Sequence, residues 1–314
     1  MDFFSHLIIT ILIARYVVEG LDIIYFYYAA FMAILADLDV FLELIPKFRN
    51  SEILSHKGVS HSFIGSALIS LIPSLMIFLI FQLDFLLSWL IGFTFYNLHI
   101  LFDFLTASKI PLLYPFSKKK YRFFIDRAVT PFLAMISISI LISSLILRFL
   151  FPYLLLFILF PIFFSFYIIY FLYKFITKIV LKIQLPNNAK YIPGTIPLVY
   201  YIYSYNNENS SIHYQLFKKH QFLGKKELVI DSQIEKNSNL MALFNRSLEI
   251  AKNFPFFSKW DAIIPIISEE ENYLKISLLL AETYSSNQGY TLNVLYKKDS
   301  EELIKFFEGF REKI

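Results

Sequence analysis

The sequence predicts an all-α polytopic membrane domain of about six helices, followed by a C-terminal soluble α/β domain. Three observations indicate this architecture. Of the 314 residues, 57% are hydrophobic. Several runs approach the ~20 apolar residues that cross a bilayer. After Lys182, charged and amide side chains become frequent and no run is long enough to span. We therefore expect a membrane-embedded domain at residues 1–182 and a soluble domain at residues 183–314.

The membrane domain is expected to contain six apolar segments. The first is short and is interrupted by Arg15, so we expect it to be tilted or only partly inserted. The other five have the length and composition of spanning helices. The six segments cover residues 6–18, 23–45, 62–82, 84–107, 129–150 and 152–176.

The C-terminal domain follows a linker of turn-forming residues, LPNNAKYIPG. Its β-type runs and helical periodicities are mixed, which is typical of an α/β domain. Basic and acidic side chains are nearly balanced in it, so we expect no direct nucleic-acid ligand. The predicted strands cover residues 196–205, 227–232, 261–267 and 290–297, and the predicted helices cover residues 240–254 and 300–314.

The distribution of positive charge predicts the orientation in the membrane. Basic residues are concentrated after the second, fourth and sixth segments, whereas the turn at 82–84 has none and the turn near Pro152 has only Arg148. We therefore expect the even-numbered exits and the C-terminal domain to face the cytoplasm, in the plasma or inner membrane. The basic residues at these exits are Lys47, Arg49, Lys57, Lys109, Lys118, Lys119, Lys120, Arg122, Arg127, Lys174, Lys178 and Lys182.

Ionisable residues are few in the first 110 residues, and this orientation brings them to one membrane face. Ionisable residues inside membrane helices are costly and indicate function by default. The chain has no cysteine, so thiolate ligands and disulfides are excluded and any transition metal needs His and carboxylate ligands. The candidate metal ligands are His6, Asp37, Asp39, His56, His61, His99 and Asp103.

The local spacings suit metal binding. His99 and Asp103 are four apart, neighbours on one helical face, where Asp can be a ligand or orient the His. Asp37 and Asp39 are two apart and point to nearly opposite sides of a helix. They therefore do not both reach one ion unless the helix loosens. Asp37 is favoured as a ligand. In the segment SHKGVSHS, Gly58 allows a turn and Ser60 is expected to cap the next helix.

This ligand set suits divalent zinc first, with manganese or iron as alternatives, and is large enough for one to three ions. Such clusters clamp phosphoester oxygens and activate a bound water. In this hypothesis Asp39 or Asp103 is the general base. Lys57, with the lysines at 118–120 as further candidates, binds the substrate phosphate.

The order of motifs LADLD, HKGVSHS, HILFDFLT and PFS, after an early SH, resembles the YdjM-like family of inner-membrane-associated metal-dependent hydrolases, also described as LexA-binding. The resemblance covers roughly residues 1–130. The family is similar to the zinc-dependent phospholipase C and nuclease superfamily, which implies phosphoester hydrolysis on a lipid-like substrate. Carried over by position, the resemblance implies the same seven metal ligands. Lys57 stands where the family usually has Arg, and Ser60 where it has Thr.

Three functions are compatible with these features. The first is a membrane-bound metal-dependent hydrolase acting on a phosphoester, with the lipid bilayer and a phospholipid as partners. The second is a non-catalytic scaffold whose helices are stapled by the metal and whose soluble domain recruits a cytoplasmic partner. The third is an ion or solute transporter. The clustering of polar residues at one face argues against transport, because a transporter needs a polar path across the bilayer.

Overall fold

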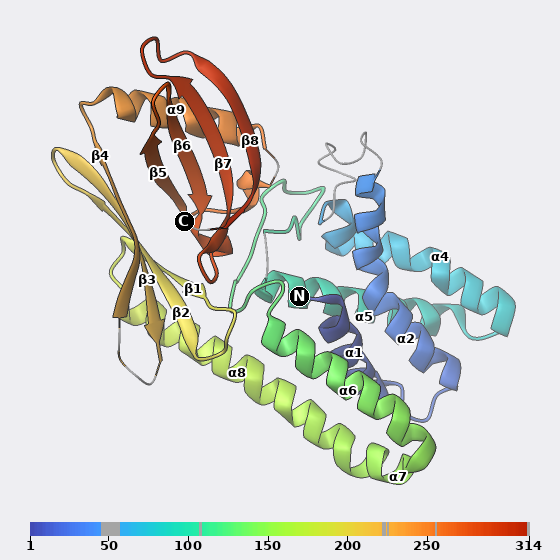
Figure 1. Ribbon diagram of the computed structural model, residues 1–314. Coiled ribbons are helices and arrows are strands. Elements are labelled where there is room, and N and C mark those ends of the chain that lie inside the picture. Colours follow the sequence, from blue (N-terminus) through green and yellow to red (C-terminus); the bar gives the residue numbers. More distant parts are fainter. Residues whose placement is uncertain (45–56, 107–108, 222–223, 225, 255, 313–314) are drawn as a thin grey trace. The chain divides into compact units, whose positions relative to one another are not determined.

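The computed structural model describes residues 1–44, 57–106, 109–221, 224, 226–254 and 256–312. The chain divides into two compact units, Met1–Ile176 and Thr177–Ile314. Figure 1 shows helices in the first unit and two β-sheets in the second. The predicted fold class, a helical membrane domain followed by an α/β domain, is confirmed.

The first unit is built of apolar helices. In the described residues, five stretches are long and apolar enough to cross a membrane: Ile23–Phe41, Phe63–Phe81, Phe85–Thr106, Pro131–Leu150 and Pro152–Gln184. The first helix has 15 residues and is about 22 Å long, shorter than the ~30 Å hydrocarbon core. The elements are α1 (Phe3–Val17), α2 (Ile23–Leu35), the 3-10 helices η1 (Ala36–Leu44) and η2 (Val59–His61), α4 (Phe63–Phe81), α5 (Phe85–Thr106), α6 (Pro131–Leu150), α7 (Pro152–Leu154), the π-helix η3 (Leu155–Leu159) and α8 (Phe160–Gln184).

Helix α4 shows how these helices pack. Its buried residues are small: Gly65, Ser66, Ser70 and Ser74. Ser74 forms a 2.7 Å hydrogen bond with the Tyr28 hydroxyl of α2. Small side chains allow close approach of helices in a bilayer, where apolar side chains gain little by facing each other instead of lipid. The large aliphatic residues of α4 are accordingly exposed on its outer face.

The second unit contains two four-stranded antiparallel sheets joined by one helix. Strand order follows the sequence in each sheet, β1-β2-β3-β4 and β5-β6-β7-β8, so neighbouring strands are joined by short connections. Helix α9 (Asn239–Lys252) connects the sheets, and its Ser247 hydroxyl lies 2.9 Å from the Tyr296 hydroxyl. The strands are β1 (Ala189–Pro193), β2 (Val199–Asn207), β3 (Ser211–His220), β4 (Lys226–Glu235), β5 (Ile263–Glu269), β6 (Tyr273–Leu280), β7 (Gln288–Lys297) and β8 (Leu303–Glu312).

One element of the second unit was predicted wrongly. The helix expected at residues 300–314 is absent from the described part, because Leu303–Glu312 form strand β8, which pairs with β7. The run LIKFFEGF is rich in Phe and Ile, which favour strands, and pairing with a neighbour decides strand formation more than local periodicity does. The linker segment also contributes strand β1, which pairs with β2.

Candidate metal centre

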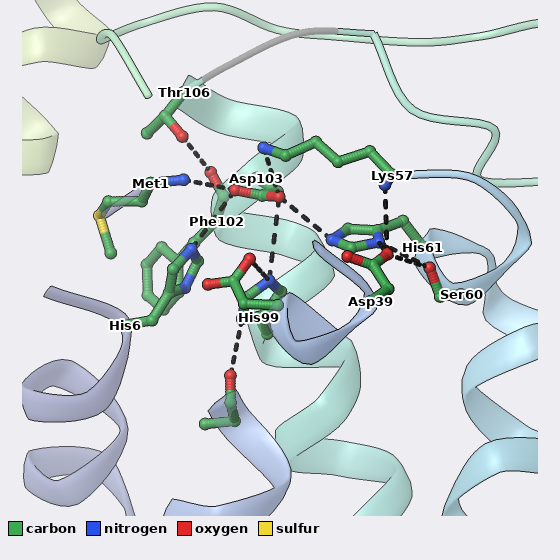
Figure 2. A network of polar contacts seen from close by, with 12 residues as sticks. Met1, His6, Asp39, Lys57, Ser60, His61, His99, Phe102, Asp103 and Thr106 are labelled. Carbon is green, nitrogen blue, oxygen red and sulfur yellow. Dashed lines mark hydrogen bonds and ion pairs between the residues drawn. The ribbon is translucent and has the colours of Figure 1, made fainter. Parts of the chain in front are cut away.

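Polar side chains from four segments converge at one end of the membrane unit. Figure 2 shows them pointing toward one another from the start of α1, the end of α2, the turn before α4 and the end of α5. Burial is complete for the histidines and for the α5 carboxylate. The residues brought together are His6, Asp37, Asp39, Lys57, His61, His99 and Asp103; His56 lies outside the described residues.

The two aspartates of the LADLD segment face different partners. Helix α2 tightens at Ala36 into the 3-10 helix η1, which carries both carboxylates. Asp37 Oδ1 lies 3.4 Å from His99 Nε2 on α5. Asp39 Oδ2 instead lies 3.3 Å from His61 Nδ1. The Asp37 side chain therefore reaches α5, whereas that of Asp39 reaches the turn before α4.

The turn before α4 is held by hydrogen bonds to Asp39. Lys57 has a left-handed backbone (φ 63°), and its amide donates to Asp39 Oδ2 at 3.2 Å. The Ser60 hydroxyl donates to the same oxygen at 2.5 Å. The left-handed residue is thus Lys57, and Gly58 beside it has φ −84° and ψ −135°. The prediction that Gly58 aims both imidazoles involves His56, which lies outside the described residues. A non-glycine residue held in this conformation indicates a backbone fixed by its surroundings.

Ser60 was also predicted to cap the helix that follows, and this is wrong. The cap of α4 is Ser62, whose hydroxyl accepts from the Gly65 amide at 3.0 Å. His61 consequently lies in the 3-10 turn η2, before the helix. Ser60 is left free to bind Asp39, because the cap position belongs to the serine two residues later.

Hydrogen bonds fix which ring nitrogen of each histidine faces the centre. His99 Nδ1 donates to the Ala33 carbonyl at 2.6 Å. His61 Nδ1 lies 3.1 Å from the Ser60 hydroxyl and 3.3 Å from Asp39 Oδ2. A neutral imidazole that donates through Nδ1 carries its lone pair on Nε2. Both histidines therefore present Nε2 toward the centre, as metal-binding histidines oriented by an outer partner do.

Four ligand atoms lie close enough to hold one ion. One atom each from Asp37, His61, His99 and Asp103 lies within 4.8 Å of all the others. The Asp103 Oδ2 atom is 3.3 Å from His61 Nε2 and 3.8 Å from His99 Nε2. Zinc bonds to nitrogen and oxygen of about 2.0–2.2 Å place tetrahedral ligand atoms roughly 3.3–3.6 Å apart. We call these four residues the candidate metal centre.

The hydrogen-bonding state of this group fits a metal. Among the described residues, His99 Nε2 is buried and has no hydrogen-bond partner, and the buried Asp103 Oδ2 has the Lys57 ammonium at 2.7 Å on one side only. Buried polar atoms are rarely left without a partner, and such atoms often mark the site of a water or an ion. These two atoms come from one turn of α5 and both face Asp37 and His61. The donor set, two imidazoles and two carboxylates, suits zinc.

Asp103 also contacts cations on its other sides. The Lys57 ammonium lies 2.7 Å from Asp103 Oδ2. The second oxygen, Oδ1, lies 3.3 Å from His6 Nε2 and contacts the amino group of Met1. The His6 ring stacks on His99 with centroids 3.8 Å apart. His6 is thus beside the four-residue group without belonging to it.

The carboxylates also determine the charge of His61. Burial lowers the pKa of this imidazole, but the carboxylates of Asp103 and Asp39 outweigh burial and raise the pKa above its ordinary value. Without a metal, the proton of His61 is therefore stabilised by the two aspartates. A divalent cation neutralises the same carboxylates and competes with that proton.

Some participants were not predicted from the sequence. The Ala33 carbonyl, which fixes His99, and the Met1 amino group are backbone or terminal atoms and carry no residue-type signal. Ser60 was noted, but for a different role. The sequence signal for Ser60 is its place beside His61, since the neighbour of a ligand often positions it.

A second buried charge cluster lies elsewhere in the membrane unit. Asp126 and Lys174 are both 1% exposed, and their Oδ1 and Nζ atoms are 3.0 Å apart. The other oxygen of Asp126 accepts from the Tyr170 hydroxyl, and the Arg127 amide donates to Oδ1 at 3.0 Å. We call this the Asp126–Lys174 pair. Lys174 was expected only as a positively charged exit residue, so its buried pairing was missed.

The comparisons with known proteins give one match. The family model of the YdjM inner membrane protein matches residues 1–178, which contain every residue of the candidate metal centre. No curated protein and no solved structure matches the chain. The match ends near the boundary at Ile176 and leaves the second unit without a family.

Proposed function

The chain belongs to the YdjM inner membrane protein family, and on that premise we propose that this multi-pass membrane protein is a metal-dependent hydrolase acting on a phosphoester of a lipid-like substrate. The observation that carries the proposal is the candidate metal centre, where four ligand atoms lie within 4.8 Å of one another. One of those atoms, His99 Nε2, is buried and has no hydrogen-bond partner among the described residues.

Asp37, His61, His99 and Asp103 would hold a divalent ion, zinc first and manganese or iron as alternatives. When bound there, the ion supplies Lewis-acid chemistry and lowers the pKa of a water ligand. His6, Asp39 and, in the segment outside the described residues, His56 are the ligands proposed for any second or third ion. The proposal covers one to three ions.

The protein's own groups divide the remaining tasks. The Lys57 ammonium, 2.7 Å from Asp103 and 8% exposed, is the proposed contact for a substrate phosphate. Asp103 Oδ1 faces His6 at 3.3 Å, so Asp103 is the favoured general base and His6 the group that shares its proton. Asp39 is engaged by Ser60 and the Lys57 amide, which favours a positioning role for Asp39 over proton transfer.

The positive charges at the even-numbered exits support a cytoplasmic site and a cytoplasmic C-terminal unit. Lys118 and Lys119 are exposed in the segment that follows α5, the helix that carries Asp103. The C-terminal unit would then regulate the site or select the substrate from the cytoplasmic side.

The test is a hydrolysis assay on the full chain in detergent, loaded with zinc or manganese. We expect metal-dependent release of phosphate or a phosphorylated headgroup from phosphatidic acid, phosphatidylglycerol or a phosphomonoester. Lys57→Met should keep its metal and raise KM about tenfold or more, since a charge-assisted contact is lost. Lys182→Met removes an exposed positive charge outside the proposed phosphate contacts, so it is the control for a general loss of charge and should change KM little.

A second function is favoured by one observation. His61, His99 and Asp103 are fully buried, as a metal that only staples helices would require. The protein would then be a non-catalytic scaffold whose second unit recruits a cytoplasmic partner. Stoichiometric metal without turnover on any of these substrates would contradict the hydrolase and leave the scaffold.

A further inference from the structure

The membrane unit contains a cavity at the end opposite the metal centre. It has a volume of about 540 Å³, within the 300–1,000 Å³ range of small-molecule sites. Its walls come from the C-terminal half of α1, the first turns of α2, the C-terminal part of α6 and the π-helix η3. Arg15 lines this cavity and lies nine residues after His6 on α1, which corresponds to ~14 Å along the helix. The cavity extends inward to Ile8, but no residue of the candidate metal centre lines it, so a ligand here is separate from that centre.

The cavity is accessible from the lipid side. Its walls are mostly aliphatic and aromatic, and several wall residues are exposed on the outer face of apolar helices: Ile23, Leu145 and Leu156. Exposed apolar residues of membrane helices face hydrocarbon. An occupant that enters between them is expected to carry an alkyl chain, because no polar molecule gains by crossing that surface.

Two arginines lie at the same cavity. Arg15 is paired with Glu19 at 2.8 Å, and Asp22 is occupied in capping α2 through the Ile24 amide. Arg148 is exposed, its guanidinium lies 3.5 Å from the Tyr27 hydroxyl, and no described carboxylate lies within ion-pair distance of it. The cavity thus combines an apolar interior with a guanidinium able to bind an anion in a bidentate way.

Two further features indicate a binding site and not simply loose packing. Residues Leu155–Leu159 are π-helical, and Leu155 and Leu156 line the cavity. Single π-helical turns are rare and occur often at functional sites. The Ser144 hydroxyl, also on the wall, is buried without a hydrogen-bond partner among the described residues. It offers a donor to an oxygen-rich group.

We propose that this cavity binds one anionic phospholipid from the leaflet opposite the metal centre, with an acyl chain in the apolar interior and the phosphate at Arg148 and Arg15. The charge pattern supports this occupant. The positive-inside rule explains basic residues at the cytoplasmic end of the unit, where the metal centre lies. It does not explain two arginines beside an apolar cavity at the opposite end, where basic residues are scarce. Guanidinium groups bind phosphate through two parallel hydrogen bonds, which fixes the headgroup at the cavity mouth.

Native mass spectrometry of the full chain tests this proposal. The detergent-purified protein is incubated with equal amounts of palmitoyl-oleoyl phosphatidylglycerol and palmitoyl-oleoyl phosphatidylcholine, and the fraction that retains one lipid is measured. We expect preferential retention of phosphatidylglycerol. Arg148→Gln, at an exposed position that should fold normally, is expected to lower retention about tenfold, the loss of one charge-assisted contact. Ser144→Phe fills the cavity and should remove retention of both lipids.

Lys182→Gln is the matched control, because it removes one exposed positive charge that does not line the cavity. It should retain the lipid as the wild type does. Metal content is measured for every variant and should not change, so failure here is distinguishable from failure of the proposed hydrolase. Equal retention of the two lipids, or unchanged retention in Arg148→Gln, would overturn the proposal.

Discussion

The candidate metal centre and the Asp126–Lys174 pair both bury charge in the membrane unit, but their polar atoms face different things. In the pair, Lys174, Tyr170 and the Arg127 amide supply hydrogen bonds to Asp126, so the carboxylate is satisfied by the protein. In the centre, Asp103 also has a cation, the Lys57 ammonium at 2.7 Å, but His99 Nε2 faces the neighbouring ligand atoms without a hydrogen bond among the described residues.

This difference separates structural from functional burial of charge. A satisfied buried pair holds elements together, here α8 and the segment before α6. In the centre, the Lys57 ammonium contacts one side of Asp103, while four ligand atoms, His99 Nε2 among them, face one another in an arrangement that a bound cation would stabilise. Burial of charge is therefore not sufficient evidence for a site, whereas the direction of the lone pairs is informative.

The largest expected effect is the loss of metal in Asp103→Asn. The change keeps the size of the side chain but removes the charge that faces His61 and His99. Metal affinity should fall by more than the ~10–100-fold that loss of an outer partner costs. The metal affinity is measured by competition with a chelating indicator. Asp126→Asn, which removes an equally buried carboxylate, is the control and should keep wild-type affinity; a wild-type affinity in Asp103→Asn would contradict the assignment.

The second prediction concerns the Asp126–Lys174 pair, where a substitution should change stability and not metal affinity. Asp126→Asn leaves the Lys174 ammonium buried without its counter-charge, and breaking a buried pair costs about 3–5 kcal/mol. The thermal unfolding midpoint in detergent should therefore fall clearly. Glu249→Gln breaks an exposed pair with Lys252 and should leave that midpoint unchanged. If both variants unfold at the same temperature, the Asp126–Lys174 pair is not a structural staple.

A smaller effect is expected from Ser60→Ala. The hydroxyl holds Asp39 at 2.5 Å and lies 3.1 Å from His61 Nδ1, so its loss should loosen the imidazole. Loss of such an outer partner typically lowers metal affinity by ~10–100-fold. Ser60→Thr keeps the hydroxyl and should restore the affinity. Ser143→Ala is the control, because the Ser143 hydroxyl donates to the Ser139 carbonyl within α6. If Ser60→Ala leaves the metal affinity unchanged, Ser60 only stabilises the turn before α4 and does not position His61.

The membrane fold could be predicted closely because apolar length and charge pattern determine it. Helices α4, α5 and α6 lie within one or two residues of their predicted segments. Strand β8 could not be predicted, because its charged and apolar residues also fit a helix and only pairing with β7 decides between them. The two sheets depend on contacts between strands, which local sequence does not encode.

At the site, the convergence of residues could be predicted from topology, but their orientation could not. His99 and Asp103 share a helical face by spacing alone. The different directions of Asp37 and Asp39 also follow from their spacing, but the partner of Asp39 in the turn before α4 does not, and the orientation of His99 depends on a backbone carbonyl. Tertiary hydrogen bonds, which leave no residue-type signal, decide these details.

The most direct test of the central claim is elemental analysis of the purified full chain, with the thermal midpoint measured before and after chelation. The account predicts at least one zinc, manganese or iron ion per chain, lost in His61→Ala and in His99→Ala, and a lower midpoint after chelation. A metal-free protein whose midpoint does not change with chelator or on adding these ions would contradict it.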